Sequence, residues 1–136
     1  MKNIKEFLKN DNFAAISGIE ILEVSQGYAK AIMNIEEKHL NALKTVQGGA
    51  IFTLADLTFA AASNVYGTVT VAINANISFV KAATGKSLTA EAKETSINPK
   101  ISTYTVNVTD DKGDLVAIFQ GMGYRKKISL DELSCI

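Results

Sequence analysis

Residues 48–64 read GGAIFTLADLTFAAASN, which is the most unusual segment of the chain. Alanine, leucine and phenylalanine occupy nearly every face of the helix that it predicts, so we expect the helix to be buried on most sides. A helix of this kind is stable only when other elements cover it. The rest of the chain must therefore provide a layer that wraps around it.

The chain before this helix predicts a short helix and a hairpin. Apolar residues at helical spacing over residues 4–8 predict an opening helix that ends near residues 10–12, where turn-forming residues gather. Residues 19–35 alternate apolar and polar side chains on both sides of Gly27, which is typical of two half-buried strands joined by a turn. Residues 36–47 lack periodicity and are expected to form a loop.

Four further strands are predicted after the helix, at residues 69–79, 88–92, 104–108 and 115–119. The first of them is expected to turn one face into the core. Turns are predicted between the strands at Gly85, at the Asn98-Pro99 pair and at residues 110–113. We therefore expect one α+β domain over residues 1–136, in which a curved antiparallel sheet wraps around one long central apolar helix.

Composition excludes several classes of function. The 136 residues are 47% apolar and 21% charged, as in folded globular domains. Fourteen basic residues balance fourteen acidic ones, so neither nucleic acid nor a membrane is expected as a partner. Cys135 is the sole cysteine, which rules out an intrachain disulfide and favours a cytoplasmic location. No stretch reaches the roughly 18 apolar residues of a membrane span, and the lysine-containing first residues do not resemble a secretory signal.

Asp56 is the one charged residue in the apolar helix. A carboxylate placed there can activate a water molecule or attack a carbonyl carbon directly. The alternative is a structural aspartate that lies on an exposed stripe or accepts hydrogen bonds from a neighbouring backbone. A Ser-His-Asp hydrolase would have to use the single histidine, His39, which we expect to lie in a loop without a catalytic duty.

Gly48 and Gly49 begin the helix, where unpaired backbone N–H groups and the positive end of the helix dipole can stabilise an oxyanion. The alternative is an ordinary helix start, because glycines are common there. Gly48 and Asp56 are about 12 Å apart along one helix, so one helix cannot hold both against one carbonyl. If both act on one substrate, the glycine and the aspartate come from different subunits, and the site requires a homodimer.

A family resemblance is carried by Asn41, Gly48, Gly49 and Asp56 within NALKTVQGGAIFTLAD, residues 41–56. This segment resembles the signature of the phenylacetate-degradation (PaaI-like) branch of the hotdog thioesterases, in the hydroxybenzoyl-CoA thioesterase superfamily. The similarity continues through residues 60–64, 77–85 and 113–124, and so covers most of the chain. It implies a hotdog fold and hydrolysis of acyl-CoA thioesters.

The resemblance also implies roles for single residues. Asp56 resembles the general base or nucleophile, Asn41 the side chain that helps to place the attacking water, and Gly48 the oxyanion donor. The site would form across a homodimer, and dimers of this kind often associate into homotetramers. No metal or redox cofactor is implied, and coenzyme A enters only as part of the substrate.

Further residues are candidates for binding the thioester or coenzyme A. Gln47 and Gly49 flank the oxyanion donor, and Ser63 and Asn64 resemble family positions near the thioester or pantetheine, although they could simply end the helix. Candidate cations for the phosphates, each of which could equally be an ordinary solvated charge, are Lys81, Lys86, Arg125 and Lys126.

Two departures from the family pattern keep other functions open. Many members carry histidine where this chain has Gln47, and glycine where it has Lys44. Glutamine cannot supply a proton near neutral pH, which puts the orientation of the thioester carbonyl and the rate of turnover in question. A hotdog protein that binds acyl-CoA or another ligand without turnover is therefore one alternative. A hydroxyacyl thioester dehydratase is another, although its expected histidine would have to be His39.

Overall fold

The computed structural model describes residues 3–135, and the side chains of residues 134 and 135, including that of Cys135, lie outside the description. Its helices are α1 (Ile4–Leu8), α2 (Asn12–Ser17), α3 (Gly48–Asn64) and the 3-10 helices η1 (Glu37–His39) and η2 (Leu130–Cys135). Its strands are β1 (Ile19–Ser25), β2 (Tyr28–Asn34), β3 (Thr68–Phe79), β4 (Ser87–Ile97), β5 (Ile101–Asp110) and β6 (Leu115–Ser129).

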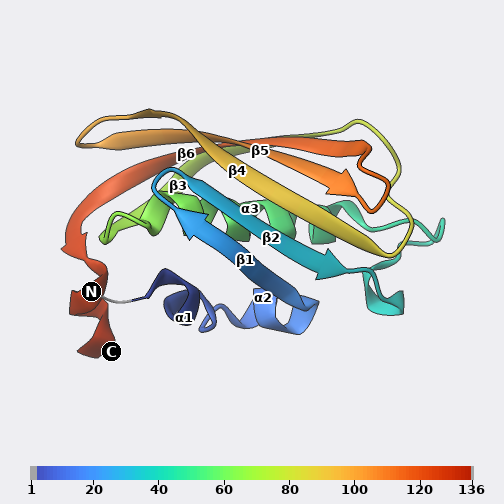
Figure 1. Ribbon diagram of the computed structural model, residues 1–136, viewed down its shortest axis with the longest axis horizontal. Coiled ribbons are helices and arrows are strands. Elements are labelled where there is room, and N and C mark those ends of the chain that lie inside the picture. The colour runs from blue at the N-terminus through green and yellow to red at the C-terminus, as the bar shows by residue number, and fades with distance from the viewer. Residues whose placement is uncertain (1–2, 136) are drawn as a thin grey trace.

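Helix α3 is the centre of the fold, as the sequence predicts. The sheet curves over it, while α1 and α2 lie on its side away from β5 and β6 (Figure 1). Leu54, Ala55 and Phe59 of α3 are buried in the hydrophobic core, and Phe59 contacts Tyr104 of β5 edge to face. The helix is therefore held by burial on most of its circumference, with a less buried stripe through Gly49, Thr53 and Asp56.

The sheet is antiparallel, with the strand order β1-β2-β4-β5-β6-β3. The predicted hairpin at Gly27 is confirmed, since its φ of 69° is the left-handed conformation that a tight turn needs. Chain order and pairing order differ in the second half, because β3 pairs with β6 and leaves β4 to pair with β2 and β5. Gly85 therefore lies in a connection that passes the ends of β5 and β6, and does not close a hairpin between β3 and β4.

The prediction that β3 turns one face into the core is wrong. Most of this strand is exposed, including Ile73, of which 53% is accessible. The reason is its position at the edge of the sheet, where it has a neighbour on one side only and lies at the margin of the layer that covers α3. Most of the alternating apolar side chains of β3 therefore lie on the surface of the single chain.

Two short helices differ from the sequence-based expectation at the N-terminus. The opening helix ends at Leu8, and the second helix, α2, was not predicted. Helix α2 is too short to display a periodic pattern, and local groups define it. The Asp11 side chain accepts a hydrogen bond from Ala14 N, and Gly18 ends the helix at a φ of 77°. The expected loop at residues 36–47 also contains η1.

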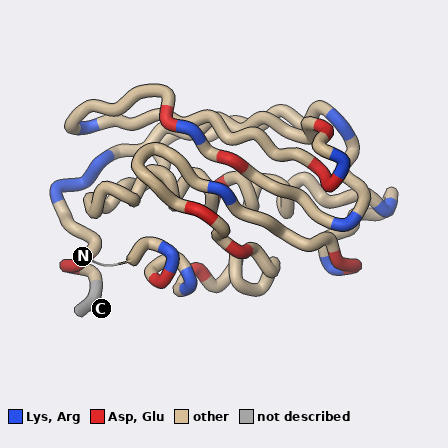
Figure 2. Tube along the Cα trace, viewed as in Figure 1, with Lys and Arg blue, Asp and Glu red and all other residues tan. Residues whose placement is uncertain are grey.

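Acidic and basic residues are interspersed over the chain in the view of Figure 2. The longest basic run visible there is residues 125–127 at the end of β6. Within the part of the chain that the structure describes, no helix is long and apolar enough to cross a membrane.

Candidate active site

The first turn of α3 presents free backbone donors. Gln47 is the N-cap residue and its side chain makes no capping hydrogen bond. Among residues 3–135, no acceptor pairs with the N–H of Gly48 or of Gly49. A Cβ atom at Gly48 would lie 3.1 Å from the Phe79 ring, and one at Gly49 would lie 2.7 Å from Gln47 Oε1. Both positions are therefore crowded by side chains, while their N–H groups stay available to an anion.

Asp56 is half-buried on the less covered stripe of α3. Its carboxylate has no hydrogen bond or ion pair with any residue that the structure describes. Burial raises the pKa of the Asp56 carboxyl, and the negative charge of Asp11, the N-cap of α2, raises it further. An unpaired carboxylate with a raised pKa is a stronger base than a solvent-exposed aspartate.

Within one chain the structure does not bring Asp56 and Gly48 together. Both lie on α3, with about 12 Å of helix between them. The separation expected from the sequence is therefore also that of the folded subunit. A carbonyl carbon beside Asp56 cannot have its oxygen at Gly48 of the same chain.

Asn41 lies in the loop before α3, where its side chain organises the backbone. Its Oδ1 accepts hydrogen bonds from Leu43 N at 2.9 Å and Thr45 N at 3.2 Å, and its Nδ2 donates to Thr45 Oγ1 at 3.0 Å. The other Nδ2 hydrogen has no acceptor within the described part of the chain, so a ligand could accept it. In the same loop, Lys44 has a φ of 65°, the left-handed conformation that favours glycine. This conformation accounts for the glycine that many family members carry at this position.

A cavity of about 400 Å³ lies beside Gly48. Its walls are the start of α3, the end of β3 and the connection that follows β3, and its lining residues include Gly48, Ile51, Phe79, Val80 and Ala83. Sequence reasoning missed Phe79 and Val80 as cavity residues, because the alternating pattern predicts that the aromatic side chain is buried. Their exposure beside an apolar cavity is a property of the tertiary structure alone.

The four candidate cations divide between the two ends of α3. Lys86 lies at the Gly48 end, where its carbonyl accepts a hydrogen bond from Ile35 N, and its side chain is exposed. Lys81 is at the same end, but its ammonium group pairs with Asp110 at 3.0 Å and Asp114 at 2.6 Å. These two lysines therefore differ in how free they are to meet a ligand.

Arg125 and Lys126 lie at the opposite end, where Arg125 pairs with Thr70 in the sheet. Arg125 Nη1 donates to Asn98 O at 3.0 Å, and its guanidinium group lies 5.7 Å from the centre of the Tyr66 ring. Arg125 Nε is buried without a partner among the described residues. Lys126 is exposed.

Ser63 and Asn64 are buried at the C-terminal end of α3. The Asn64 side chain accepts from Thr70 N at 2.8 Å and donates to Thr70 O at 3.2 Å and Ala60 O at 2.9 Å. Ser63 Oγ donates to Ala60 O at 3.3 Å. These bonds join the helix to the start of β3, so both residues have the contacts expected of a helix end.

His39 is buried and linked to backbone on both sides of its ring. Its Nδ1 accepts from Glu36 N at 2.9 Å, and its Nε2 donates to Ser17 O at 2.8 Å. Both ring nitrogens are therefore occupied in joining η1 to α2. This arrangement leaves His39 no free nitrogen for acid or base chemistry in the single chain.

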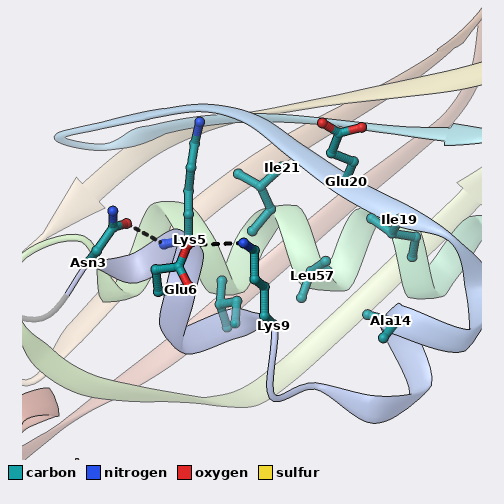
Figure 3. Close-up of a pocket in the computed structure, with 11 residues that line it drawn as sticks. Asn3, Lys5, Glu6, Lys9, Ala14, Ile19, Glu20, Ile21 and Leu57 are labelled. Carbon is teal, nitrogen blue, oxygen red and sulfur yellow. Dashed lines mark hydrogen bonds and ion pairs between the residues drawn. The ribbon is translucent and has the colours of Figure 1, made fainter.

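A second cavity, of about 510 Å³, is not at this site. It lies between α1, α2, β1 and Leu57 of α3, and neither Gly48 nor Asp56 lines it (Figure 3). Its rim carries Lys5, Lys9, Glu6 and Glu20, whose charges cancel. No group of three or more His, Cys, Asp or Glu side chains in the described range could hold a metal ion.

Comparison with known proteins agrees with this architecture. Residues 43–117 match the model of the family described as the thioesterase superfamily. A protein of Archaeoglobus fulgidus, whose name places it provisionally among the esterases, is 41% identical over 127 residues, covering 92% of this chain and 82% of its own. Acyl-coenzyme A thioesterase PaaI of Escherichia coli is 30% identical over 125 residues, covering 91% of this chain and 89% of its own.

Solved structures give the same result. That of E. coli PaaI, from the phenylacetic acid degradation operon, has a TM-score of 0.88 at 29% identity and covers 91% of each chain. A variant of the phenylacetic acid degradation protein PaaI of Thermus thermophilus has a TM-score of 0.81 at 31% identity, covering 85% of this chain and all of its own. The family match spans more than half of the chain. The chain therefore belongs to the thioesterase superfamily, has the hotdog fold and is a thioester hydrolase.

Proposed function

We propose that the protein hydrolyses acyl-CoA thioesters, with Asp56 of one subunit and the Gly48 N–H of a second subunit acting on the same carbonyl group. The observation that carries the proposal is the half-buried, unpaired carboxylate of Asp56 on a helix that begins with free N–H groups. The name of the E. coli relative, an acyl-coenzyme A thioesterase, supports coenzyme A as the thiol.

The reaction divides into addition and loss of the thiol. Asp56 removes a proton from water, which Asn41 helps to place, and the water oxygen bonds to the thioester carbon. The carbonyl oxygen then carries negative charge, which the Gly48 N–H and the α3 dipole stabilise. The carbon–sulfur bond breaks, the thiolate takes the proton, and the products are the free acid and coenzyme A.

Asp56 could instead attack the carbon directly and form an anhydride that water then hydrolyses. A single turnover in heavy-oxygen water can establish direct attack. Heavy oxygen in the Asp56 carboxylate would show that an anhydride formed and was hydrolysed at that side chain, whereas a general base leaves the protein unlabelled. No step in either route requires a metal or redox cofactor, so we expect turnover to persist in the presence of a chelator.

The edge of the sheet supports a homodimer. Strand β3 leaves one side unpaired and contains no charged residue or proline, which are the usual protection of an edge strand. Exposed apolar side chains, including Ile73 and Phe79, lie along it. A two-fold axis at this edge would pair β3 with its copy in antiparallel orientation and would also make the two α3 helices antiparallel. That is the arrangement in which Gly48 of one subunit can approach Asp56 of the other.

The cavity beside Gly48 is our candidate for the pantetheine channel, because it is apolar and adjoins the proposed oxyanion donor. Antiparallel helices would bring the Lys86 end of one subunit toward the Arg125 and Lys126 end of the other. Cations from both subunits could then meet the phosphates of one coenzyme A. Ser63 and Asn64 would support the site by fixing the end of α3.

We further propose that dimers associate into tetramers, as the family resemblance implies, and that the protein is cytoplasmic, as the composition favours. Sedimentation equilibrium tests the first proposal, and cell fractionation tests the second. A species that stays dimeric at all concentrations, or one recovered outside the cytoplasm, would contradict them.

The proposed function is tested by measuring thiol release from a panel of aromatic and aliphatic acyl-CoA esters. Wild type is compared with Asp56→Asn, which keeps the size of the side chain and removes its charge. We expect release to depend on Asp56, and the panel to rank the acyl groups. Binding without thiol release would favour the ligand-binding alternative, in which Gln47 fails to replace histidine; an unsaturated thioester product would favour a dehydratase.

Subunit mixing tests the shared site directly. Asp56→Asn and Gly48→Pro subunits are each expected to be inactive, yet a hybrid dimer contains one site with both groups intact. Random exchange makes half of the dimers hybrids, so about one quarter of wild-type activity should return. Mixing that restores nothing, although exchange is confirmed by mass spectrometry, would place both groups in one subunit and contradict the proposal.

A further inference from the structure

Lys81 lies in the connection of residues 80–86, which carries the chain from β3 to β4. Because β5 and β6 separate these two strands in the sheet, the connection has to pass the turn between β5 and β6. Asp110 and Asp114 flank that turn. The topology therefore places Lys81 beside two carboxylates that are far from it in sequence.

The Lys81 ammonium group pairs with both carboxylates of this turn. Its Nζ donates to Asp110 Oδ2 at 3.0 Å and to Asp114 Oδ2 at 2.6 Å. The Asp110 side chain is only 5% exposed, and its other oxygen accepts from Lys112 N and Asp114 N, both at 3.0 Å. Asp110 thus fixes the turn with one oxygen and the connection with the other. The Lys81 hydrogen bond holds the pKa of the Asp110 carboxyl below its ordinary value, as a stable pair requires.

The segment anchored in this way forms a wall of the cavity beside Gly48. Val80 N donates to Val116 O at 2.9 Å, and Val46 N donates to Ala83 O at 2.9 Å, so the backbone is tied on both sides. Phe79, at the start of the wall, lies 3.1 Å from the position that a Cβ of Gly48 would occupy. A shift of the connection would therefore change the space in front of the proposed oxyanion donor.

We propose that Lys81 is a positioning residue, whose ion pairs with Asp110 and Asp114 hold residues 79–83 against Gly48. The inference rests on the proposed function, because it concerns the oxyanion end of that same site. It replaces the expectation that Lys81 is a ligand of the coenzyme A phosphates. The two carboxylates that already pair with Lys81 would compete with a phosphate for its ammonium group. Lys86, which is exposed at the same end, has no carboxylate partner among the described residues.

The test compares two substrates, an acyl-CoA and the matching acyl-pantetheine, which lacks the phosphates. We expect Lys81→Met to lower kcat/KM by about tenfold or more on both substrates, since a misplaced wall affects the carbonyl and not the phosphates. Asp114→Asn should lower it in the same direction, and Lys81→Arg should restore most of the activity. Lys86→Met is the matched control, and its loss should be confined to acyl-CoA and appear mainly in KM.

A phosphate ligand would behave in the opposite way. Lys81→Met would then impair acyl-CoA only, and Asp114→Asn would free the lysine and improve KM for acyl-CoA. Either result, or no change in any variant, would overturn the proposal.

Failure of the proposed function is distinguishable. If wild type hydrolyses neither substrate, hydrogen exchange of the amides of Val80 and Lys81 still decides the positioning role. Faster exchange in Lys81→Met and Asp114→Asn, reversed in Lys81→Arg, supports the positioning role of Lys81, and unchanged exchange overturns it.

Discussion

Replacing Gly48 by proline removes one N–H group and little else. Gly48 is the first residue of α3, a position where proline is favoured because the N–H has no partner within the helix. The preceding residue, Gln47, has φ of −62° and ψ of 138°, which is the extended conformation that a residue before proline requires. We therefore expect Gly48→Pro to fold with a Tm close to that of wild type.

The expected effect on turnover is large. Loss of a single oxyanion donor costs about 2.7–4 kcal/mol of transition-state stabilisation, which corresponds to a fall of about 10²–10³ in kcat. Gly48→Ala is the matched control, because it places the same Cβ 3.1 Å from the Phe79 ring but keeps the N–H. Phe79 is 53% exposed, so its ring can move by the few tenths of an ångström required. Gly48→Ala should therefore lower kcat much less than Gly48→Pro.

The assay is thiol release under saturating acyl-CoA, with Tm and oligomeric state measured on the same preparations. Equal kcat for the proline and alanine variants would refute the oxyanion role of the Gly48 N–H. An equal fall of kcat in both variants would attribute the effect to the Cβ contact with Phe79 and not to the missing N–H donor.

The structure makes five further predictions. Burial and the charge of Asp11 raise the pKa of Asp56, so Asp11→Asn, which keeps the helix cap, should move the acid limb of the kcat/KM profile to lower pH; an unchanged limb would contradict the coupling. A raised folded-state pKa means that stability falls as pH rises through it, so Asp56→Asn should raise Tm at neutral pH. His39→Ala should lower stability by about 1–3 kcal/mol for each backbone group left unpaired but keep kcat, whereas loss of kcat in folded protein would favour the dehydratase alternative. Lys44→Gly should relieve left-handed strain and raise the free energy of unfolding by roughly 0.5–1 kcal/mol, and Lys44→Ala should not. Ile73→Lys should yield folded, inactive monomers by light scattering; active dimers would exclude the β3 edge as the interface.

Burial and local turn chemistry explain which elements could be predicted. The apolar run at residues 48–64 can be stable only as a covered helix, and α3 has those bounds. Gly27 and the turn at residues 110–113 provide the conformations that their hairpins need, so both hairpins were predicted. Helix α2 was missed because its stability comes from a cap at Asp11 and from packing on α3, neither of which produces a periodic pattern.

The candidate site divides in the same way. Asp56 and Gly48 stood out from their neighbours in the sequence, and the resemblance to the family added Asn41. The eight-residue spacing of the first two predicted that they come from different subunits if both act on one substrate. The raised pKa of Asp56 could not be read from the sequence, because it depends on burial in the folded chain and on the charge of Asp11, which lies 45 positions earlier.

The central helix, the alternation of the strands and the residues of the family signature could be predicted, because they depend on side-chain periodicity and on chemistry carried by single residues. The edge position of β3 and the pairing of Lys81 became visible in the folded chain alone. Both outcomes depend on strand order, and strand order is set by which faces bury together, a global property that local periodicity does not encode.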